Sequence, residues 1–154
     1  TLLTKYNNVQ NNARDIQEPL EISEKLDMDS EGLVFLTNDM NLTNLLAQPN
    51  FEHEKEYEVV IDKALSKDAK KVLEHGMRQD ETFAQGITIK KEFNKGKRTI
   101  VTITVIETKA GQIKKMFETL GYHVVTLRRT RMGKLRLGTL AVGKWKFVSR
   151  ESII

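Results

Sequence analysis

The chain has 154 residues, enough for one domain and barely enough for two. Hydrophobic residues make up 39% and charged residues 30%, which is enough apolar material for a buried core. The chain has no cysteine, so disulfides, thiolate metal sites and cysteine nucleophiles are excluded. No uncharged apolar run approaches the ~20 residues of a membrane span, so we expect no membrane association.

The formal net charge of +4 averages two very different parts of the chain. Residues 1–62 carry 4 basic and 13 acidic side chains, net −9, whereas residues 63–154 carry 21 basic and 8 acidic side chains, net +13. Positive charge concentrated on one part of a chain is typical of proteins that bind a polyanion. The charges alone leave open the alternative that the two parts neutralise each other in the fold.

The first third of the chain predicts a lead-in, a strand and a short helix. Residues 1–22 are polar and poorly patterned, and we expect them to be extended. The apolar run Leu33–Thr37 predicts a buried strand. Asn41 is a suitable N-cap for a helix that Pro49 would end. The apolar face of this helix would consist of Leu42, Leu45 and Leu46.

The middle of the chain predicts a strand followed by a capped helix. In Glu54–Ile61, Tyr57, Val59 and Ile61 alternate with other side chains, which is the pattern of a half-buried strand. Ser66 and Gly76 are suitable residues for the two ends of a helix over Lys67–His75.

The remaining predicted elements are two strands joined by a turn, a helix and a further strand. Ile87–Phe93 and Thr99–Ile106 both alternate, and residues 94–97 between them predict a hairpin turn. Gln112–Leu120 has apolar residues at helical spacing, and Val124–Leu127 begins another strand. Hairpins beside helices indicate an α+β fold with a mixed, mainly antiparallel sheet flanked by helices.

Two carboxylates stand immediately before the first predicted strand. Asp27 and Asp29 are two residues apart, and Gly32 follows them. An aspartate anchored at the edge of a core can act as a nucleophile or base, because its surroundings fix its orientation and its ionisation. The alternative is an Asx turn that leads into the strand.

Tyr57 and the lysine pair Lys114 and Lys115 are further candidates. A tyrosine on a strand is usually a packing residue, but it can also stack on a base or transfer a proton. The lysines lie in the first turn of a helix, where the helix dipole disfavours cations, so they need a carboxylate or a phosphate as a partner.

Arginines gather on the last long strand, at Arg128, Arg129 and Arg131. On a regular strand, Arg129 and Arg131 share one face and Arg128 takes the other. Such a row suits contact with phosphates, although a charged edge strand is an equally ordinary explanation.

Several kinds of site have no support in the sequence. The three histidines, His53, His75 and His123, do not have metal-ligand spacing. We therefore expect no metal. There is no glycine-rich phosphate loop and no nucleophile elbow, so neither a nucleotide cofactor nor a Ser/His/Asp hydrolase is supported.

Four segments in order resemble one family, the ribosomal RNA pseudouridine synthases. The family motif Gly-Arg-Leu-Asp-x-Asp/Asn-Ser/Thr-x-Gly-Leu is similar to residues 24–33, and its Lys-x-Tyr-x-Val to residues 55–59. Residues 112–117 resemble its Gln-Val/Ile-Lys/Arg-Arg-Met segment, and residues 127–133 its Leu-x-Arg-x-Arg-Ile-Gly. The resemblance runs from about residue 24 to 151. It is to the branch with small subunit synthase A and large subunit synthases B, E and F, and most of all to F.

The resemblance implies an isomerase and assigns roles. Asp27 corresponds to the essential aspartate that attacks a flipped-out uridine, Tyr57 to the active-site tyrosine, and Lys114 to the basic residue that pairs with the aspartate. The implied RNA contacts are Lys25, Lys115, Arg128, Arg129 and Arg131. No metal or cofactor is implied.

The resemblance also implies the partners and the organisation. We expect residues 1–154 to be a single catalytic domain that lacks the family's N-terminal S4 RNA-binding domain. The expected partner is ribosomal RNA, with tRNA as an alternative, for a cytoplasmic monomer. Two departures, Glu24-Lys25 for Gly-Arg and Ala110-Gly111 for Asn-Arg, motivate a second hypothesis: a catalytically impaired or non-catalytic RNA-binding paralogue on the same fold. A third is an adaptor whose acidic front binds a basic protein.

Overall fold

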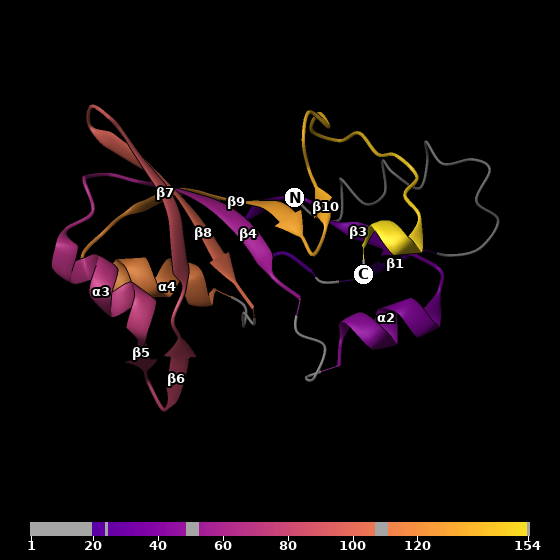
Figure 1. Ribbon diagram of the computed structural model, residues 1–154, viewed down its shortest axis with the longest axis horizontal. Coiled ribbons are helices and arrows are strands. Elements are labelled where there is room, and N and C mark those ends of the chain that lie inside the picture. The colour runs from indigo at the N-terminus through magenta and orange to yellow at the C-terminus, as the bar shows by residue number, and fades with distance from the viewer. Residues whose placement is uncertain (1–19, 24, 49–52, 107–110, 154) are drawn as a thin grey trace.

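A six-stranded sheet forms the centre of the computed structural model, which describes residues 20–23, 25–48, 53–106 and 111–153 (Figure 1). Five strands lie in the order β10-β9-β4-β8-β7, all antiparallel to their neighbours, and β2 adds to β9 in parallel. Their bounds are β2 Glu31–Gly32, β4 Lys55–Ile61, β7 Thr88–Lys95, β8 Arg98–Val105, β9 Val124–Met132 and β10 Leu135–Arg136. The sheet is mixed and mainly antiparallel, so the predicted α+β class is confirmed.

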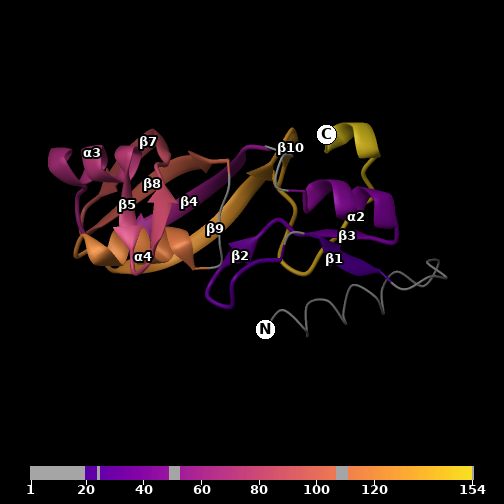
Figure 2. The same cartoon turned by 90° about the horizontal axis from the view of Figure 1, so that it is seen from below.

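Helices α3 (Lys67–His75) and α4 (Gln112–Thr119) pack against one face of this sheet. The predicted helix over Lys67–His75 is confirmed to the residue, because the Ser66 hydroxyl accepts the Ala69 amide at 3.1 Å and Gly76 ends the helix with φ +95°. The larger apolar core lies between the two helices and β4, β8 and β9. Figures 1 and 2 show both helices at the same end of the molecule.

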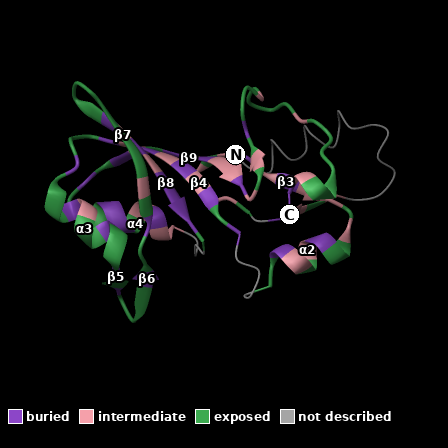
Figure 3. Cartoon of the chain, in the orientation of Figure 1, coloured by how far each residue is buried: buried purple, intermediate pink, exposed green. Residues whose placement is uncertain are grey.

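Strand β4 follows the predicted alternation closely. Lys55, Tyr57, Val59 and Ile61 are buried, and the residues between them are half-buried (Figure 3). The buried set faces the helices, because Tyr57, Val59 and Ile61 share the larger core with residues of α4. The other face of the sheet is open and carries Glu56 and Glu58.

The predicted hairpin is also present, with a tighter turn than expected. Strands β7 and β8 pair as far as Lys95 opposite Arg98, so the turn consists of Gly96 and Lys97 instead of residues 94–97. Gly96 has φ +70°, which glycine adopts at little cost. A second hairpin, β5 (Gly76–Gln79) with β6 (Thr82–Gln85), has no signal in the apolar pattern.

A smaller core lies at the other end of the molecule, where β1 (Glu21–Ser23) and β3 (Phe35–Thr37) form a two-stranded sheet beside α2 (Met40–Leu46). It contains Leu33, Phe35, Leu42, Leu46, Met132, Leu137 and Ile153. The single strand expected over Leu33–Thr37 is therefore divided: β3 pairs with β1, while Leu33 follows β2.

The cap of α2 differs from the prediction. Asp39, not Asn41, is the N-cap, and its Oδ1 accepts the amides of Asn41 and Leu42 at 2.9 and 3.1 Å. A carboxylate two residues earlier competes successfully because it reaches two free helix amides. Leu42 and Leu46 are buried as expected. Pro49, like residues 1–19 of the expected lead-in, lies outside the described residues.

An irregularity in β9 overturns the expected arrangement of its arginines. Arg131 pairs with Glu56 and Arg129 with Tyr57, so Thr130 is an extra residue between them. Since Glu56 and Tyr57 point to opposite faces, Arg129 and Arg131 also do. Arg128, in register with Glu58, lies on the open face with Arg131. A bulge of this kind cannot be read from the alternation of apolar residues.

Of the described helices, none is both long enough and apolar enough to cross a membrane.

Gly32 lies where β2 meets β9, and its substitution tests that contact. Gly32 has φ +115°, and a Cβ there would lie 2.2 Å from the Arg129 carbonyl oxygen. We expect Gly32→Ala to lower the free energy of unfolding by at least about 3 kcal/mol, because backbone atoms cannot move aside as a flexible side chain can.

Gly96→Ala is the matched control. Gly96 also has a positive φ, but nothing lies within 4 Å of the position that a Cβ would take there. We expect a loss of about 1 kcal/mol in urea unfolding, from backbone strain alone. Equal losses in the two variants would contradict the close contact at Gly32.

Candidate active site

The loop that carries Asp27 is held by a turn within it and by the segment that follows it. Within the loop, the Ser30 amide donates to the Asp27 carbonyl at 3.0 Å, which closes a turn. Beyond the loop, Glu31 and Gly32 pair with Arg128 and Arg129 of β9, and the Leu33 amide donates to the Arg129 carbonyl at 2.9 Å. The two carboxylates are therefore delivered to the edge of the central sheet by a short, anchored segment.

The Asp27 carboxylate lies at the N-terminus of α4. Its Oδ2 accepts the Gly111 amide at 2.5 Å, across 84 residues of sequence. Gly111 is the N-cap of the helix and adopts the left-handed conformation, with φ +69°. The free amides of a helix N-terminus attract an anion, so this position suits an ionised carboxylate. Asp27 is half-buried, which leaves one side of it accessible.

Lys114 lies in the first turn of the same helix, and its partner differs from the expected one. Its Nζ lies 2.9 Å from Asp29 Oδ2 and 3.9 Å from Glu118 Oε1. The hydrogen bond and the negative charge of Asp29 raise the pKa of the Lys114 ammonium above its usual 10.5. The carboxylate paired with this first-turn lysine is therefore Asp29, whereas Asp27 accepts the Gly111 amide.

Tyr57 occupies the sheet beside this loop. It is directly opposite Arg129 of β9, which is directly opposite Gly32 of β2, so these three residues form one transverse row. With strands spaced about 4.8 Å apart, Tyr57 lies about 10 Å from Gly32. Its side chain is 6% exposed and faces the helices, in the core that also contains Ile113 of α4. Lys114 is thus part of α4 and the Asp27 carboxylate lies at its N-terminus, while Tyr57 belongs to the core on which α4 packs.

Arg129 does not present its side chain to solvent. It is 2% exposed, and its Nε donates to the Leu33 carbonyl at 2.9 Å. The expectation that Arg129 contacts RNA does not agree with this position, because the bulge at Thr130 turns its side chain into the interior. In this place it stabilises the segment that follows the Asp27 loop.

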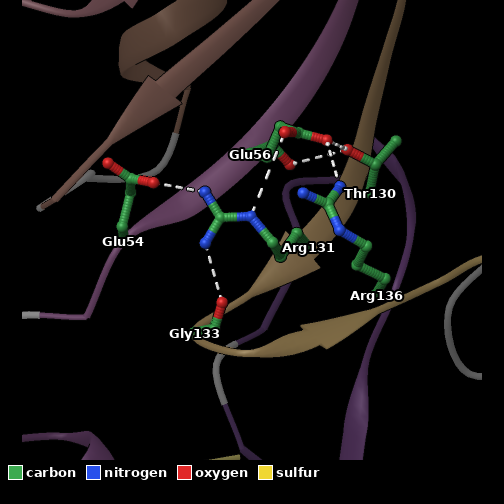
Figure 4. Close-up of polar contacts among 6 residues, drawn as sticks. All are labelled: Glu54, Glu56, Thr130, Arg131, Gly133 and Arg136. Atoms are coloured by element: carbon green, nitrogen blue, oxygen red, sulfur yellow. Dashed lines mark hydrogen bonds and ion pairs between the residues drawn. The ribbon is translucent and has the colours of Figure 1, made fainter.

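Arg131 is occupied by partners within the protein (Figure 4). Its guanidinium forms an ion pair with Glu54, lies 3.9 Å from Glu56, and donates to the Gly133 carbonyl at 2.7 Å. Glu56 also accepts hydrogen bonds from Thr130 at 2.8 Å and Arg136 at 3.3 Å. Here the acidic front and the basic back neutralise each other, which was the open alternative for the charge distribution.

The other three predicted RNA contacts are more accessible. Lys25 is exposed beside the Asp27 loop, and Arg128 is half-buried on the open face. Lys115 is exposed on α4 and forms an ion pair with Asp80, in the turn between β5 and β6. These three residues can still meet a phosphate.

A cavity of about 730 Å³ borders the Asp27 loop. Leu26, Met28 and Ser30 line one edge of it, and Trp145 and Phe147 line another. Asp27, Tyr57 and Lys114 are not among its lining residues, so the cavity does not unite the three candidates.

In the described part of the chain, no three histidine, aspartate or glutamate side chains are grouped so that they could hold a metal ion.

Sequence reasoning missed three participants. The Gly111 amide is a backbone group, so no side chain in the sequence points to it. The only sign in the sequence is that Ala110-Gly111 stands where the family has Asn-Arg. Asp29 stands beside Asp27 in the sequence, but nothing there assigns it to Lys114. Arg136, whose side chain is 64% exposed, lies outside the four motifs. It reaches Glu56, which is also a partner of Arg131, because the β9–β10 hairpin places Arg136 opposite Arg131.

Comparison with known proteins identifies the class. The family model described as RNA pseudouridylate synthase matches residues 2–119, and the chain belongs to this family. The resemblance that the four motifs indicated is therefore confirmed.

Particular relatives are similar over most of this chain. The dual-specificity RNA pseudouridine synthase RluF of Escherichia coli strain K12 is 32% identical over 130 residues, which are 84% of this chain and 43% of that protein. The ribosomal large subunit pseudouridine synthase B of Bacillus subtilis strain 168 is 33% identical over 77% of this chain and 50% of its own length. A crystal structure of a pseudouridylate synthase superposes with a TM-score of 0.74 at 26% identity, covering 87% of this chain and 58% of that one. The chain thus spans about half the length of these relatives.

Asp29→Asn tests the assignment of Asp29 to Lys114. Because the carboxylate raises the pKa of Lys114, its removal is expected to return that pKa toward 10.5, as followed by NMR of the Lys114 side chain during a pH titration. In the wild type, the stabilisation from this pair is present below the ordinary lysine pKa and is lost as the pH rises through the raised folded-state value. The variant should lack this contribution.

Glu118→Gln is the matched control. Glu118 is farther from Lys114 and raises its pKa less than Asp29 does. A larger fall in the pKa of Lys114 for Glu118→Gln than for Asp29→Asn would show that Asp29 is not the principal partner.

Proposed function

We propose that this chain is the catalytic part of an RNA pseudouridine synthase that converts a uridine of ribosomal RNA to pseudouridine, with Asp27 as the nucleophile. The observation that carries the proposal is the Asp27 carboxylate at the N-terminus of α4, 2.5 Å from the Gly111 amide. Family membership and the similarity to ribosomal large subunit synthase B support the substrate class. The same proposal includes a single domain that works as a monomer.

The reaction is an isomerisation, so no external reactant is required. The bond between uracil N1 and ribose C1′ breaks, and a bond between uracil C5 and C1′ forms. A proton leaves C5 and a proton is gained at N1, so the atoms balance. The protein must therefore supply a nucleophile, a means of moving protons, and a place where the base can turn.

Asp27 suits the first task. A carboxylate can attack the ribose or the base and form a covalent intermediate that divides one difficult step into two. The Gly111 amide orients the carboxylate while one side of it stays accessible. Because a uridine inside a helix cannot reach this group, the nucleotide has to leave its stack before it reacts.

Tyr57 suits the second task, and Lys114 can help to hold the RNA. Tyr57 is opposite Arg129 in the row that leads to Gly32, and we assign the transfer of a proton to its phenol. Lys114, held by Asp29, keeps a positive charge beside the Asp27 loop that can attract a backbone phosphate. Lys25, Lys115 and Arg128 extend this positive surface.

Asp27→Asn is expected to abolish product formation. The amide keeps the shape and can still accept a hydrogen bond from Gly111, but it is no longer a nucleophile. We expect a loss of at least about 1,000-fold in pseudouridine formed on unmodified large-subunit ribosomal RNA. RNA affinity should remain that of the wild type.

Asp68→Asn is the control, because Asp68 is exposed in α3 and belongs to no part of the proposed site. It should keep the wild-type rate. If the wild type itself binds this RNA and forms no product, the non-catalytic RNA-binding alternative replaces the proposal.

Tyr57→Phe separates the phenol from the ring. The ring alone preserves the packing against the core, so the variant should fold with wild-type stability. We expect single-turnover product formation to fall about 100-fold if the hydroxyl moves a proton, with RNA affinity unchanged. An unchanged rate would restrict Tyr57 to packing and stacking.

A further inference from the structure

The β7–β8 hairpin carries a positive charge that the fold does not neutralise. We call residues 88–105 the basic hairpin. Five basic residues and one acidic residue lie within 88–98, net +4, which equals the net charge of the whole chain. The acidic residue, Glu92, forms an ion pair with Lys70 of α3. The basic residues are Lys90, Lys91, Lys95, Lys97 and Arg98.

The cations at the tip are unusual in their arrangement. Lys95 stands directly opposite Arg98 across the hairpin, with Lys97 in the turn between them. Like charges in directly opposite positions destabilise a pair of strands unless an anion lies between them. In the described part of the chain, no carboxylate is within ion-pair distance of Lys95, Lys97 or Arg98. On β9, by contrast, Glu54 and Glu56 neutralise Arg131.

An exposed aromatic ring lies among these cations. Phe93 is 62% exposed and is opposite Ile100, on the face that also carries Lys91, Lys95 and Arg98. Glu92 and Val101, on the other face, are directed toward the helices. Figure 1 shows the hairpin projecting from the sheet at the upper left, and Figure 3 shows that β7 and the tip are largely exposed.

We propose that the basic hairpin binds an RNA strand, with an unpaired base stacked on Phe93 and backbone phosphates on Lys91, Lys95 and Arg98. A flat ring flanked by cations is the arrangement that binds single-stranded RNA, because every base has a face that stacks and every nucleotide carries a phosphate. This inference rests on the proposed function for its choice of polyanion.

The hairpin is distinct from the candidate active site. Tyr57 is opposite Ile103 of β8, and Arg98 lies five residues farther along that strand, or about 17 Å away. The hairpin therefore holds RNA that flanks the reacting nucleotide. An edge strand protected from aggregation by charge would explain the lysines, but it would not explain the exposed ring.

The charges are tested with the double variant Lys95→Ala with Arg98→Ala in the full chain. The probe is unmodified large-subunit ribosomal RNA, titrated at several salt concentrations. We expect weaker binding and a decrease of about 2 in the slope of log affinity against log salt, because two phosphate contacts are lost. The matched control, Lys67→Ala with Lys71→Ala, removes two exposed charges from α3 and should keep the wild-type slope. Equal changes in both double variants would overturn the proposal.

The ring is tested with three variants of Phe93. Phe93→Ala and Phe93→Leu should weaken binding about tenfold with an unchanged salt slope, because stacking is lost and no charge is removed. The leucine keeps an apolar contact with Ile100, so a folding defect is separated from a stacking defect. Phe93→Trp should retain the wild-type affinity. Wild-type affinity in Phe93→Leu, or weak binding in Phe93→Trp, would overturn the role of the ring.

Failure of the hairpin and failure of the catalytic proposal give different results. If the hairpin binds RNA, product formation at saturating protein is the same for the charge variant and the wild type. If the wild type forms no product but its affinity still depends on Lys95, Arg98 and Phe93, the enzymatic proposal fails and the hairpin stands.

Discussion

The close contact between Gly32 and the backbone of β9 is the constraint on which the candidate site depends. Since a Cβ at Gly32 would overlap the Arg129 carbonyl oxygen, only glycine lets β2 approach this strand. The contact draws the Asp27 loop onto the sheet and leaves the Asp27 carboxylate beside the Gly111 amide. It also explains why Arg129 is buried, because its guanidinium then supports the carbonyl of Leu33. The position of the Asp27 carboxylate and the packing of β2 on the sheet thus depend on the same contact.

The opposing charges of the two parts of the chain serve two purposes. Along β4 and β9, glutamates neutralise arginines, and the network of Glu54, Glu56 and Arg131 holds the β9–β10 hairpin in place. Around α4, Asp29 pairs with Lys114 and Asp80 with Lys115. Away from both regions, the basic hairpin retains its charge. Neutralisation therefore accounts for much of the basic excess near the site, and what remains unneutralised lies where a long polyanion can reach it.

The accuracy of sequence reasoning depended on the range of the interactions involved. The helix over Lys67–His75 was predicted to the residue because its caps, Ser66 and Gly76, are its immediate neighbours. The cap of α2 was wrong by two positions, since Asp39 and Asn41 are both suitable residues and Asp39 is the one that reaches two free helix amides. The faces of Arg129 and Arg131 were wrong because a single extra residue reverses the alternation of a strand. In the candidate site, Asp27, Tyr57 and Lys114 stay predictions from motifs, and the sequence did not predict that Lys114 pairs with Asp29.

By itself, the sequence determined the class of the fold, the family and, to within one or two residues, the bounds of α3, α4, β4 and the β7–β8 hairpin, because these depend on local periodicity, capping and ordered motifs. The tertiary structure alone decided which charges meet. In the structure, Lys114 pairs with Asp29 and the Asp27 carboxylate accepts the Gly111 amide. The Arg129 side chain is buried, and Lys95 lies directly opposite Arg98. The physical reason is that electrostatic and hydrogen-bond energies depend on distances across strands and loops. Those distances follow from register, bulges and close backbone contacts that no short stretch of residues specifies.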